Sequence, residues 1–383
     1  MNFEFATPTR IVFGCGSIQT AAEYINANAL CLLAIVGKNP SRFEPFFNKI
    51  NPTIKTIFYT INGEPTIELV EQGVQIARQH KCDMVAGIGG GSVIDAAKAI
   101  SALITNSGKL IDYLEVIGHG KPLEKPAIPY IAIPTTAGTG AEVTKNAVIT
   151  STNYNVKASL RHQFLYPKLA VVDPELTISA PPELTASTGL DALTQLIEPF
   201  ISAKSNPLTD ALCIEGLKRI ARSLKRAFEN GKDLSARTDM ALASLFSGMA
   251  LANAGLGAVH GFAAPIGGSF PAPHGAVCAA LLPPVMQVNL KALKERTPQS
   301  HTLEKIQTIA RILTNNPNAV YEDAIHWLSD TCKYLKIKKL GELGIKQSDF
   351  PSIIEKAKKA SSMKGNPIQL TDEELKEILL LAT

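Results

Sequence analysis

The stretch "DMVAGIGGGSVIDAAKAI" (83–100) combines a strand, a glycine-rich turn and the start of a helix. The segment "DMVAGIG" (83–89) is almost continuously apolar, as expected of a strand buried on both faces of a parallel sheet. "SVIDAAKAISALIT" (92–105) is typical of the helix that follows such a strand. A strand that leads through a tight turn into a helix is the repeating unit of parallel α/β folds.

The three glycines of this turn also indicate a binding site. Gly90 and Gly91 let a ligand approach the backbone closely, and Ser92 with the free N–H groups of the helix start can bind a phosphate. The spacing differs from the G-x-G-x-x-G pattern of the usual dinucleotide-binding fold. The alternative is a tight turn without a ligand, but three consecutive glycines exceed what a turn needs, which favours phosphate binding.

A second polar loop follows the next predicted strand. "PTTAGTGAEVTKNAVIT" (134–150) places Thr135, Thr136 and Thr144 around two glycines. Small hydroxyl side chains beside glycine suit packing against a flat ring or a pyrophosphate. A plain turn with satisfied threonines fits this loop equally well.

The rest of the chain divides into an α/β part and a helical part. Strand-like stretches occur at 30–36, 54–61, 83–89 and 128–136, and helical ones at 66–80 and 92–105. Strand signals stop after 168–176, and long amphipathic patterns such as 207–230 and 370–382 follow. We therefore expect an α/β domain with a parallel sheet over residues 1–180 and an all-α domain over 181–383.

Composition excludes several classes of protein. The 383 residues carry 38 basic and 34 acidic side chains without a long basic run, so nucleic-acid binding is not indicated. The N-terminal segment does not have the pattern of a signal peptide, and the apolar run "ALCLLAIV" near it is too short to span a membrane. The six cysteines form no C-x-x-C pair and suit a reducing compartment. We expect a cytoplasmic enzyme without a membrane or nucleic-acid partner.

Three side chains in the second half suggest a metal site. In "STGLDALTQLIEPF" (187–200), Asp191 and Gln195 lie one turn apart on one helix face. His260 and His274 fall in one glycine-rich segment, and each is followed by a glycine that we interpret as leaving the imidazole accessible. Two histidines and a carboxylate are a plausible ligand set for a divalent transition metal with open positions. The alternatives are satisfied core histidines and a first-turn helix acid.

Several segments together resemble a known family. They are "GIGGGSVIDAAKAI", "IPTTAGTGAEVT", "YPKLAVVDPELT", "TGLDAL", "NPLTDAL", "GLGAVHGFAAPIGG" and "APHGAVCAALLP". In order and spacing, nearly end to end, the chain resembles the iron-containing (group III) alcohol dehydrogenases. The resemblance implies a dehydroquinate synthase-like architecture, in which an α/β domain binds the dinucleotide, a helical domain holds metal and substrate, and the active site lies between them. It also implies a homodimer.

The resemblance implies roles for individual residues. Gly90, Gly91 and Ser92 correspond to residues that hold the cofactor pyrophosphate, and Thr135, Thr136 and Thr144 to contacts on the pyrophosphate and nicotinamide side. Lys157 corresponds to a lysine near the nicotinamide ribose, its alternative being a solvated lysine on an edge strand. Asp191, His260 and His274 correspond to three of four metal ligands and would act catalytically through the metal, Fe²⁺ or Zn²⁺.

The departures from the family pattern concern the same site. Gln195 stands where the family has its fourth ligand, a histidine, and Ala264 stands where it commonly has a histidine beside the substrate. The amide is a weaker donor than imidazole, so we expect Gln195 to be a weak or water-bridged ligand. The first strand ends in Gly37 and not in the aspartate common among NAD-linked members, with Lys38 and Arg42 close behind, so NADP(H) is at least as plausible as NAD(H).

Four functions remain open at this stage. The first is an NAD(P)-dependent alcohol dehydrogenase or aldehyde reductase that polarises its substrate with the metal. The second is a metal-free reductase of an acidic keto substrate, resembling maleylacetate reductases, which Gln195 favours and Asp191 disfavours. The third is a lyase resembling dehydroquinate synthase, for which region 240–280 has too few basic residues. The fourth is a non-catalytic relative.

Overall fold

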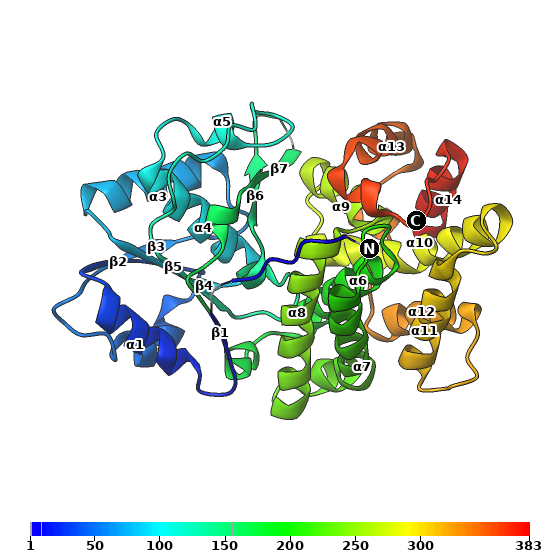
Figure 1. Cartoon of the computed structure of the whole chain (residues 1–383), viewed down its shortest axis with the longest axis horizontal. Coiled ribbons are helices and arrows are strands. Elements are labelled where there is room, and N and C mark those ends of the chain that lie inside the picture. The colour runs from blue at the N-terminus through cyan, green and yellow to red at the C-terminus, as the bar shows by residue number, and fades with distance from the viewer. Residues whose placement is uncertain (1, 9, 155) are drawn as a thin grey trace. The chain divides into compact units, whose positions relative to one another are not determined.

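The chain forms two compact units in the computed structural model, which describes residues 2–8, 10–154 and 156–383 (Figure 1). One unit comprises Thr7–Ile178, and the other comprises Ser179–Thr383 together with the N-terminal residues up to Ala6. The division in the chain thus falls between residues 178 and 179, where the sequence predicted 180. The N-terminal segment groups with the second unit because the backbone of Ala6 exchanges two hydrogen bonds, of 2.7 and 2.9 Å, with the side chain of Asn253.

A six-stranded parallel sheet forms the centre of the first unit. Its strands are β1 Ile11–Phe13, β2 Cys31–Val36, β3 Lys55–Thr60, β4 Met84–Gly89, β5 Tyr130–Pro134 and β8 Leu169–Val172. They lie in the order β1-β8-β5-β4-β2-β3, and every neighbouring pair is parallel. Every residue of β2 and β4 is buried, as their continuous apolar sequences predict. The predicted α/β fold class is confirmed.

Helices cover both faces of this sheet (Figure 1). They are α1 Ile18–Asn28, α2 Glu44–Phe47, α3 Ile67–Gln79, α4 Gly91–Thr105 and α5 Leu110–Tyr113. Successive side chains of a strand point to opposite faces, so Leu32 and Ala34 of β2 join the core on the α1 side, whereas Leu33 and Ile35 join the core on the α3 and α4 side. The result is a three-layer α/β/α unit.

An antiparallel hairpin follows the second polar loop. Its strands are β6 Asn146–Ser151 and β7 Val156–Arg161. The sequence does not predict this hairpin, because residues up to 150 have the composition of a polar loop. The signal was a short alternation, since Ala147 and Ile149 point into the core while their neighbours are half-buried.

The second unit is helical, as predicted. Its helices are α6 Pro182–Ile201, α7 Pro207–Glu229, α8 Leu234–Ala254, α9 Ala258–Ser269, α10 His274–Arg296, α11 His301–Thr314, α12 Tyr321–Tyr334, α13 Phe350–Lys359 and α14 Asp372–Ala382. The side chain of Thr371 caps α14 by accepting a hydrogen bond from the N–H of Glu374. Helix α6 is central, because all of its residues from Gly189 to Ile201 are buried.

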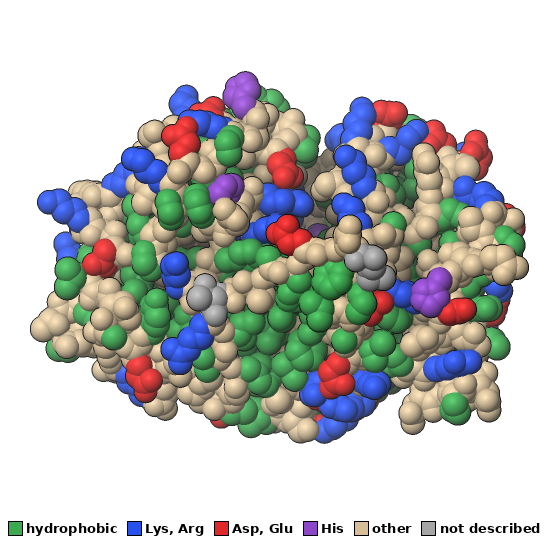
Figure 2. Space-filling model, in the orientation of Figure 1, with side chains coloured by type: hydrophobic (Ala, Val, Ile, Leu, Met, Phe, Trp, Pro, Cys, Tyr) green, Lys and Arg blue, Asp and Glu red, His purple; other side chains and the backbone are tan. Residues whose placement is uncertain are grey.

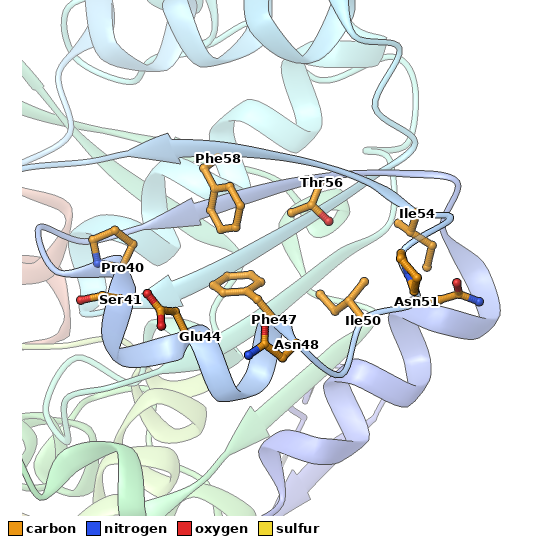
Figure 3. Close-up of a pocket in the computed structure, with 11 residues that line it drawn as sticks. Pro40, Ser41, Glu44, Phe47, Asn48, Ile50, Asn51, Ile54, Thr56 and Phe58 are labelled. Carbon is orange, nitrogen blue, oxygen red and sulfur yellow. The ribbon is translucent and has the colours of Figure 1, made fainter.

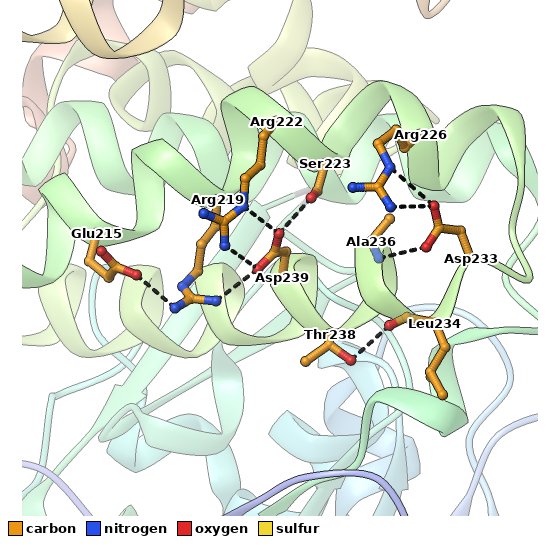
Figure 4. Close-up of polar contacts among 10 residues, drawn as sticks. All are labelled: Glu215, Arg219, Arg222, Ser223, Arg226, Asp233, Leu234, Ala236, Thr238 and Asp239. Atoms are coloured by element: carbon orange, nitrogen blue, oxygen red, sulfur yellow. Dashed lines mark hydrogen bonds and ion pairs between the residues drawn. The ribbon is translucent and has the colours of Figure 1, made fainter. Parts of the chain in front are cut away.

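A buried carboxylate joins helices α7 and α8. Asp239 of α8 accepts hydrogen bonds from Arg219, Arg222 and Ser223 of α7, at distances of 2.6 to 2.7 Å (Figure 4). These contacts lower the pKa of Asp239 against the opposing effect of its burial. The network fixes the register of α7 against α8 and thereby supports α6, which packs on both.

Two features bear on the predicted absence of nucleic-acid and membrane partners: the distribution of charge and the length of the apolar helices. Basic and acidic side chains are interspersed over the face in Figure 2, without one large basic area. In the described part of the chain, α10 is long and apolar enough to span a membrane, and the bent pair α8–α9 passes the same test if taken as one span. However, 78% of the apolar window of α10 is buried inside the protein, as in the core helix of a globular domain.

Candidate functional site

The glycine-rich turn lies where the chain reverses its direction across the sheet. Strands β2 and β4 are neighbours, but the chain continues from β2 outward to β3 and from β4 the other way to β5. The connections that leave their carboxyl ends therefore run in opposite directions, and ligands of open α/β sheets bind at such a switch point. Gly37 follows β2, and Gly90, Gly91 and Ser92 follow β4.

The two polar loops predicted from the sequence lie against each other. A Cβ atom at Gly91 would lie 2.8 Å from Cγ2 of Thr139, and a Cβ atom at Gly90 would lie 3.5 Å from Oγ1 of Thr136. The N–H of Thr135 donates to the carbonyl of Gly89 at 2.9 Å. Gly90 is the N-cap of α4 without a side-chain cap, so the first N–H groups of this helix can bind an anion.

A buried lysine fixes this arrangement. The Nζ atom of Lys98, in α4, donates to Oγ1 of Thr144 at 2.7 Å and to the carbonyl of Asn146 at 2.8 Å, and pairs with Asp95 at 3.3 Å. Burial lowers the pKa of Lys98 and raises that of Asp95, and it raises the pKa of nearby Glu142 to about 7. Lys98 thus ties the helix after the first loop to the end of the second.

The remaining predicted cofactor residues are engaged elsewhere in the first unit. The hydroxyl of Thr144 accepts from Lys98 and donates to the carbonyl of Ala141 at 3.1 Å, so its hydrogen-bonding capacity is used within the protein. Lys157 lies on β7 with only 9% of its side chain exposed, and its Nζ atom pairs with Glu64 at 3.0 Å. It is therefore not a solvated lysine, which was the alternative drawn from the sequence.

The two cations after β2 have different surroundings. Lys38 is exposed. The guanidinium of Arg42 donates to the carbonyl of Leu176 at 2.7 Å and lies over the ring of Phe43, and partial burial lowers its pKa. Lys38 is consequently the freer of the two to meet a phosphate group.

An open surface pocket of about 710 Å³ lies between α2 and the edge strand β3 (Figure 3). Phe47 and Phe58 contribute most of its aromatic surface, and Pro40 and Ser41 lie at one end. None of the residues predicted as functional lines this pocket.

The predicted metal ligands converge in the helical unit. Asp191 comes from α6, His260 from the first turn of α9 and His274 from the first residue of α10. Oδ1 of Asp191 lies 3.5 Å from Nε2 of His260 and 3.7 Å from Nε2 of His274. The same oxygen is buried and has no hydrogen-bond partner among the described residues. A buried oxygen that faces two imidazole nitrogens is the arrangement that a bound cation completes.

Gln195 lies beside this cluster but is held by other groups. Its Nε2 atom donates to Oδ2 of Asp191 at 3.0 Å, and its Oε1 atom accepts from Oγ of Ser247, in α8, at 3.0 Å. The amide therefore orients Asp191 so that the other carboxylate oxygen faces the two histidines.

A second carboxylate orients His260. Oε2 of Glu198, one helical turn beyond Gln195, accepts from Nδ1 of His260 at 2.6 Å, and Oε1 accepts from the N–H of Val259 at 2.7 Å. This contact leaves Nε2 of His260 facing Asp191. A carboxylate behind a histidine is the usual support of a metal-binding imidazole. Sequence reasoning missed Glu198, although its spacing from Asp191 and Gln195 (i, i+4, i+7) places all three on one helix face.

A cysteine also belongs to this cluster and was missed. Sγ of Cys278, one turn after His274 on α10, lies 3.6 Å from Nε2 of His274 and 3.9 Å from Nε2 of His260. Ligand atoms of Asp191, His260, His274 and Cys278 all lie within 4.8 Å of one another. The available signal is the i, i+4 spacing of His274 and Cys278, which places both side chains on one helix face.

The four ionisable groups of the cluster are close enough to change one another's pKa values. Burial alone raises the pKa of Asp191, but the imidazoles of His260 and His274 bring it below its usual value. The pKa of Cys278 is also below its usual value. Burial alone would raise it, but the two imidazoles more than offset this effect. Burial opposes protonation of His260, yet Cys278, Glu198 and Asp191 raise its pKa well above the usual value, and Cys278 raises that of His274 most. The four groups therefore shift one another's pKa values, as closely packed ligand groups do.

The predicted accessibility of the two histidines holds only for His274, and Gly275 also has a packing role. His260 is buried and is not accessible, whereas 33% of the side chain of His274 is exposed. A Cβ atom at Gly275 would lie 2.5 Å from the carbonyl oxygen of Ser187. Glycine is needed there because the first turn of α10 touches the backbone of α6, which brings His274 to Asp191.

The donor set fits a divalent transition metal. Two imidazole nitrogens and a carboxylate oxygen from three helices face one point, and the unpartnered oxygen of Asp191 is the direct observation. Of these three side chains, that of His274 is the most exposed, at 33%.

Comparison with known proteins assigns the chain to a family. The family model described as "Iron-containing alcohol dehydrogenase" matches residues 8–174, and "Fe-containing alcohol dehydrogenase family, C-terminal" matches residues 185–383. Alcohol dehydrogenase 4 of Schizosaccharomyces pombe is 36% identical over 381 residues, which cover 98% of this chain and 87% of that protein.

Solved structures agree with this assignment. A crystal structure of 1,3-propanediol oxidoreductase has 32% sequence identity and a TM-score of 0.92, covering 100% of both chains. A sulfoacetaldehyde reductase from Bifidobacterium kashiwanohense, crystallised in complex with NAD⁺, has 25% identity and a TM-score of 0.88, covering 100% of this chain and 99% of its own. The chain therefore belongs to the iron-containing alcohol dehydrogenase family and is an oxidoreductase that acts on CH–OH groups.

Proposed function

We propose that this protein is an NAD(P)-dependent alcohol dehydrogenase, or aldehyde reductase, that uses a divalent metal ion held by Asp191, His260 and His274. The observation that carries the proposal is the buried Oδ1 of Asp191, which has no hydrogen-bond partner among the described residues and faces Nε2 of both histidines. A carboxylate placed in this way without a cation would lose much of the hydrogen bonding that water supplies to it.

The bound groups supply the reactive chemistry. A divalent metal acts as a Lewis acid that polarises an alcohol or carbonyl oxygen, and the nicotinamide ring carries the hydride.

Side chains next to the proposed metal ligands fix the orientation of two of them. Glu198 holds the ring of His260 through Nδ1, and Gln195 holds Oδ2 of Asp191, so neither group can rotate away. Both supporting residues are buried, which keeps water from competing for these contacts. The partly exposed His274 marks the side from which substrate approaches.

Cofactor binding is assigned to the turn between β4 and α4. Gly90, Gly91 and Ser92 would bind the pyrophosphate through backbone N–H groups at the start of α4, with Thr135 and Thr136 beside them. Gly37 stands at the end of β2, where no carboxylate repels a 2′-phosphate and exposed Lys38 can attract one. We propose that the enzyme uses NADP(H) at least as well as NAD(H).

Thr144 and Lys157 are assigned an indirect role in cofactor binding. The hydroxyl of Thr144 is bonded to Lys98, and the ammonium of Lys157 is paired with Glu64. Both residues stabilise the segment that follows the second loop, and direct contact by Lys157 with the nicotinamide ribose would require it to leave Glu64.

Ala264 has consequences for substrate and proton. It is half-buried in α9, one turn after His260. A methyl group cannot transfer a proton, so the alcohol proton leaves through water or the cofactor ribose. The small side chain also leaves room for a bulkier substrate than an imidazole would.

The competing functions differ in what they require of Asp191. A metal-free reductase of an acidic keto substrate gains nothing from a buried carboxylate, which would repel its substrate. The lyase reading needs basic residues that region 240–280 lacks. We also propose that the protein is a cytoplasmic homodimer, as the family resemblance implies. Sedimentation tests the dimer, and cell fractionation tests the location.

Turnover with a panel of alcohols and aldehydes tests the proposal. The purified protein should oxidise NADPH or NADH with an aldehyde, and incubation with a chelator should abolish the activity until Fe²⁺ or Zn²⁺ is restored. Activity that survives complete metal removal would instead support the metal-free reductase, and no turnover with any member of the panel would support a non-catalytic relative.

A further inference from the structure

We infer that the thiolate of Cys278 is the fourth protein ligand of the metal, in place of Gln195, and that the resulting Asp-His-His-Cys site binds Zn²⁺ in preference to Fe²⁺. The inference rests on the proposed metal site and specifies its ligands. It goes beyond the three ligands and the doubtful amide that the sequence predicts.

Gln195 cannot serve as a ligand without losing its present contacts. Its Nε2 atom donates to Asp191 and its Oε1 atom accepts from Ser247, so both ends of the amide are used. Reversing the amide would place Oε1 against the carboxylate oxygen of Asp191, where two acceptors repel each other. The metal site therefore has three ligands from the predicted set and lacks a fourth.

Cys278 occupies the missing corner. A tetrahedral zinc ion with Zn–N near 2.05 Å and Zn–S near 2.3 Å has S···N edges of about 3.6 Å and O···N edges of about 3.3 Å. In the structure, Sγ of Cys278 lies 3.6 and 3.9 Å from the two imidazole nitrogens, and Oδ1 of Asp191 lies 3.5 and 3.7 Å from them. These four edges lie within about 0.4 Å of the tetrahedral values, and all four ligand atoms lie within 4.8 Å of one another.

The surroundings of the thiol distinguish it from an ordinary core cysteine. A buried cysteine usually packs as a small apolar group. Cys278 is fully buried, but its sulfur faces the Nε2 atoms of His260 and His274, and the buried oxygen of Asp191 faces the same point. Two independent features, the sulfur position and the unpartnered oxygen, therefore indicate one cation.

The ligand types determine the metal preference. A ligand set with thiolate Cys278 and carboxylate Asp191 supplies two negative charges, which balance a divalent ion. A set with Gln195 in place of Cys278 supplies only the one charge of Asp191. Thiolate is a soft donor that favours Zn²⁺, while an all-nitrogen and oxygen set suits Fe²⁺ better. With four protein ligands, a substrate oxygen would have to enter as a fifth ligand or displace one of the four.

Cobalt substitution of the full-length protein tests the assignment directly. Co²⁺ bound by a thiolate gives an intense near-ultraviolet charge-transfer band, which nitrogen and oxygen ligands do not give. We expect this band at one Co²⁺ per chain in the wild type and in the control variant Cys332→Ser, whose thiol contacts the carbonyl of Ala279 outside the cluster. We expect the variant Gln195→Leu to keep the band and Cys278→Ser to lose it, with Zn²⁺ affinity falling at least about tenfold in Cys278→Ser.

The wild type also provides a readout that does not depend on variants folding. X-ray absorption at the zinc edge should show one sulfur scatterer at about 2.3 Å. Stoichiometric metal without a sulfur scatterer, or a charge-transfer band that persists in Cys278→Ser, would overturn the inference. Metal-dependent turnover without sulfur ligation would leave the proposed function standing. If the metal is bound by sulfur but the protein has no dehydrogenase activity, the proposed function is refuted and the assignment of Cys278 as a ligand stands.

Discussion

Replacing Glu198 tests whether His260 is a metal ligand held in place from behind. Glu198 is 4% exposed and accepts from Nδ1 of His260 at 2.6 Å and from the N–H of Val259 at 2.7 Å. The substitution Glu198→Gln preserves the volume but turns one of the two accepting oxygens into an NH₂ group. Either His260 or Val259 must then face a donor instead of an acceptor.

The expected magnitude follows from the role of such supports. Loss of a carboxylate behind a metal-binding histidine weakens metal affinity by roughly 10- to 100-fold, which corresponds to about 1.4 to 2.7 kcal/mol. Glu198→Ala should give the larger effect, since it leaves both donors unpaired, and each buried unpaired donor also lowers the free energy of unfolding by about 1 to 3 kcal/mol.

Competition between the protein and a chelator for Zn²⁺ measures the affinity of each variant. The matched control is Glu183→Gln, the same substitution at an exposed position in the first turn of the same helix, and it should bind Zn²⁺ like the wild type. Circular dichroism confirms that each variant is folded. If folded Glu198→Gln binds Zn²⁺ as tightly as the wild type, His260 is not a ligand or does not depend on Glu198, and the reasoning fails.

Three further predictions concern the first unit. Gly90→Ala should unfold at the wild-type temperature, because its Cβ meets Thr136 at an ordinary 3.5 Å, but should raise the KM for cofactor about tenfold by occupying the place of a phosphate. Burial raises the pKa of Glu142 to about 7. The free energy of unfolding should therefore fall by about 3 kcal/mol as pH rises from about 4.5 to 7. Urea titrations should show this loss in the wild type but not in Glu142→Gln. Equal pH dependence in both would contradict that pKa. Gly37→Asp should lower the ratio of kcat/KM for NADP⁺ over NAD⁺ at least about tenfold, and an unchanged ratio would place the ribose elsewhere.

The sheet was predictable because its strands are buried on both faces. Continuous apolar runs such as those of β2 and β4 are typical of parallel strands, and the glycine turn marks where the next helix begins. The hairpin of β6 and β7 was not predictable in the same way. Its strands are half-buried, and part of its stability comes from Lys98 and Asp95 on α4, contacts that sequence patterns do not reveal.

The cluster of Asp191, His260, His274 and Cys278 was predictable only in part. Asp191, His260 and His274 were found because their residue types are common ligands and because a family resemblance singled them out. Cys278 and Glu198 were missed although each follows a recognised residue at helical spacing. Whether a side chain one turn away points to the same atom depends on how α6, α9 and α10 pack, which in turn depends on close contacts such as that of Gly275 with Ser187.

The central claim is that Asp191, His260 and His274 together hold a metal ion. Elemental analysis of protein that has been stripped with a chelator, reconstituted with Zn²⁺ or Fe²⁺ and freed of excess metal tests it most directly. We predict about one ion per chain in the wild type and almost none in folded Asp191→Ala. A wild-type protein without stoichiometric metal, or an Asp191→Ala variant that keeps it, would contradict the account.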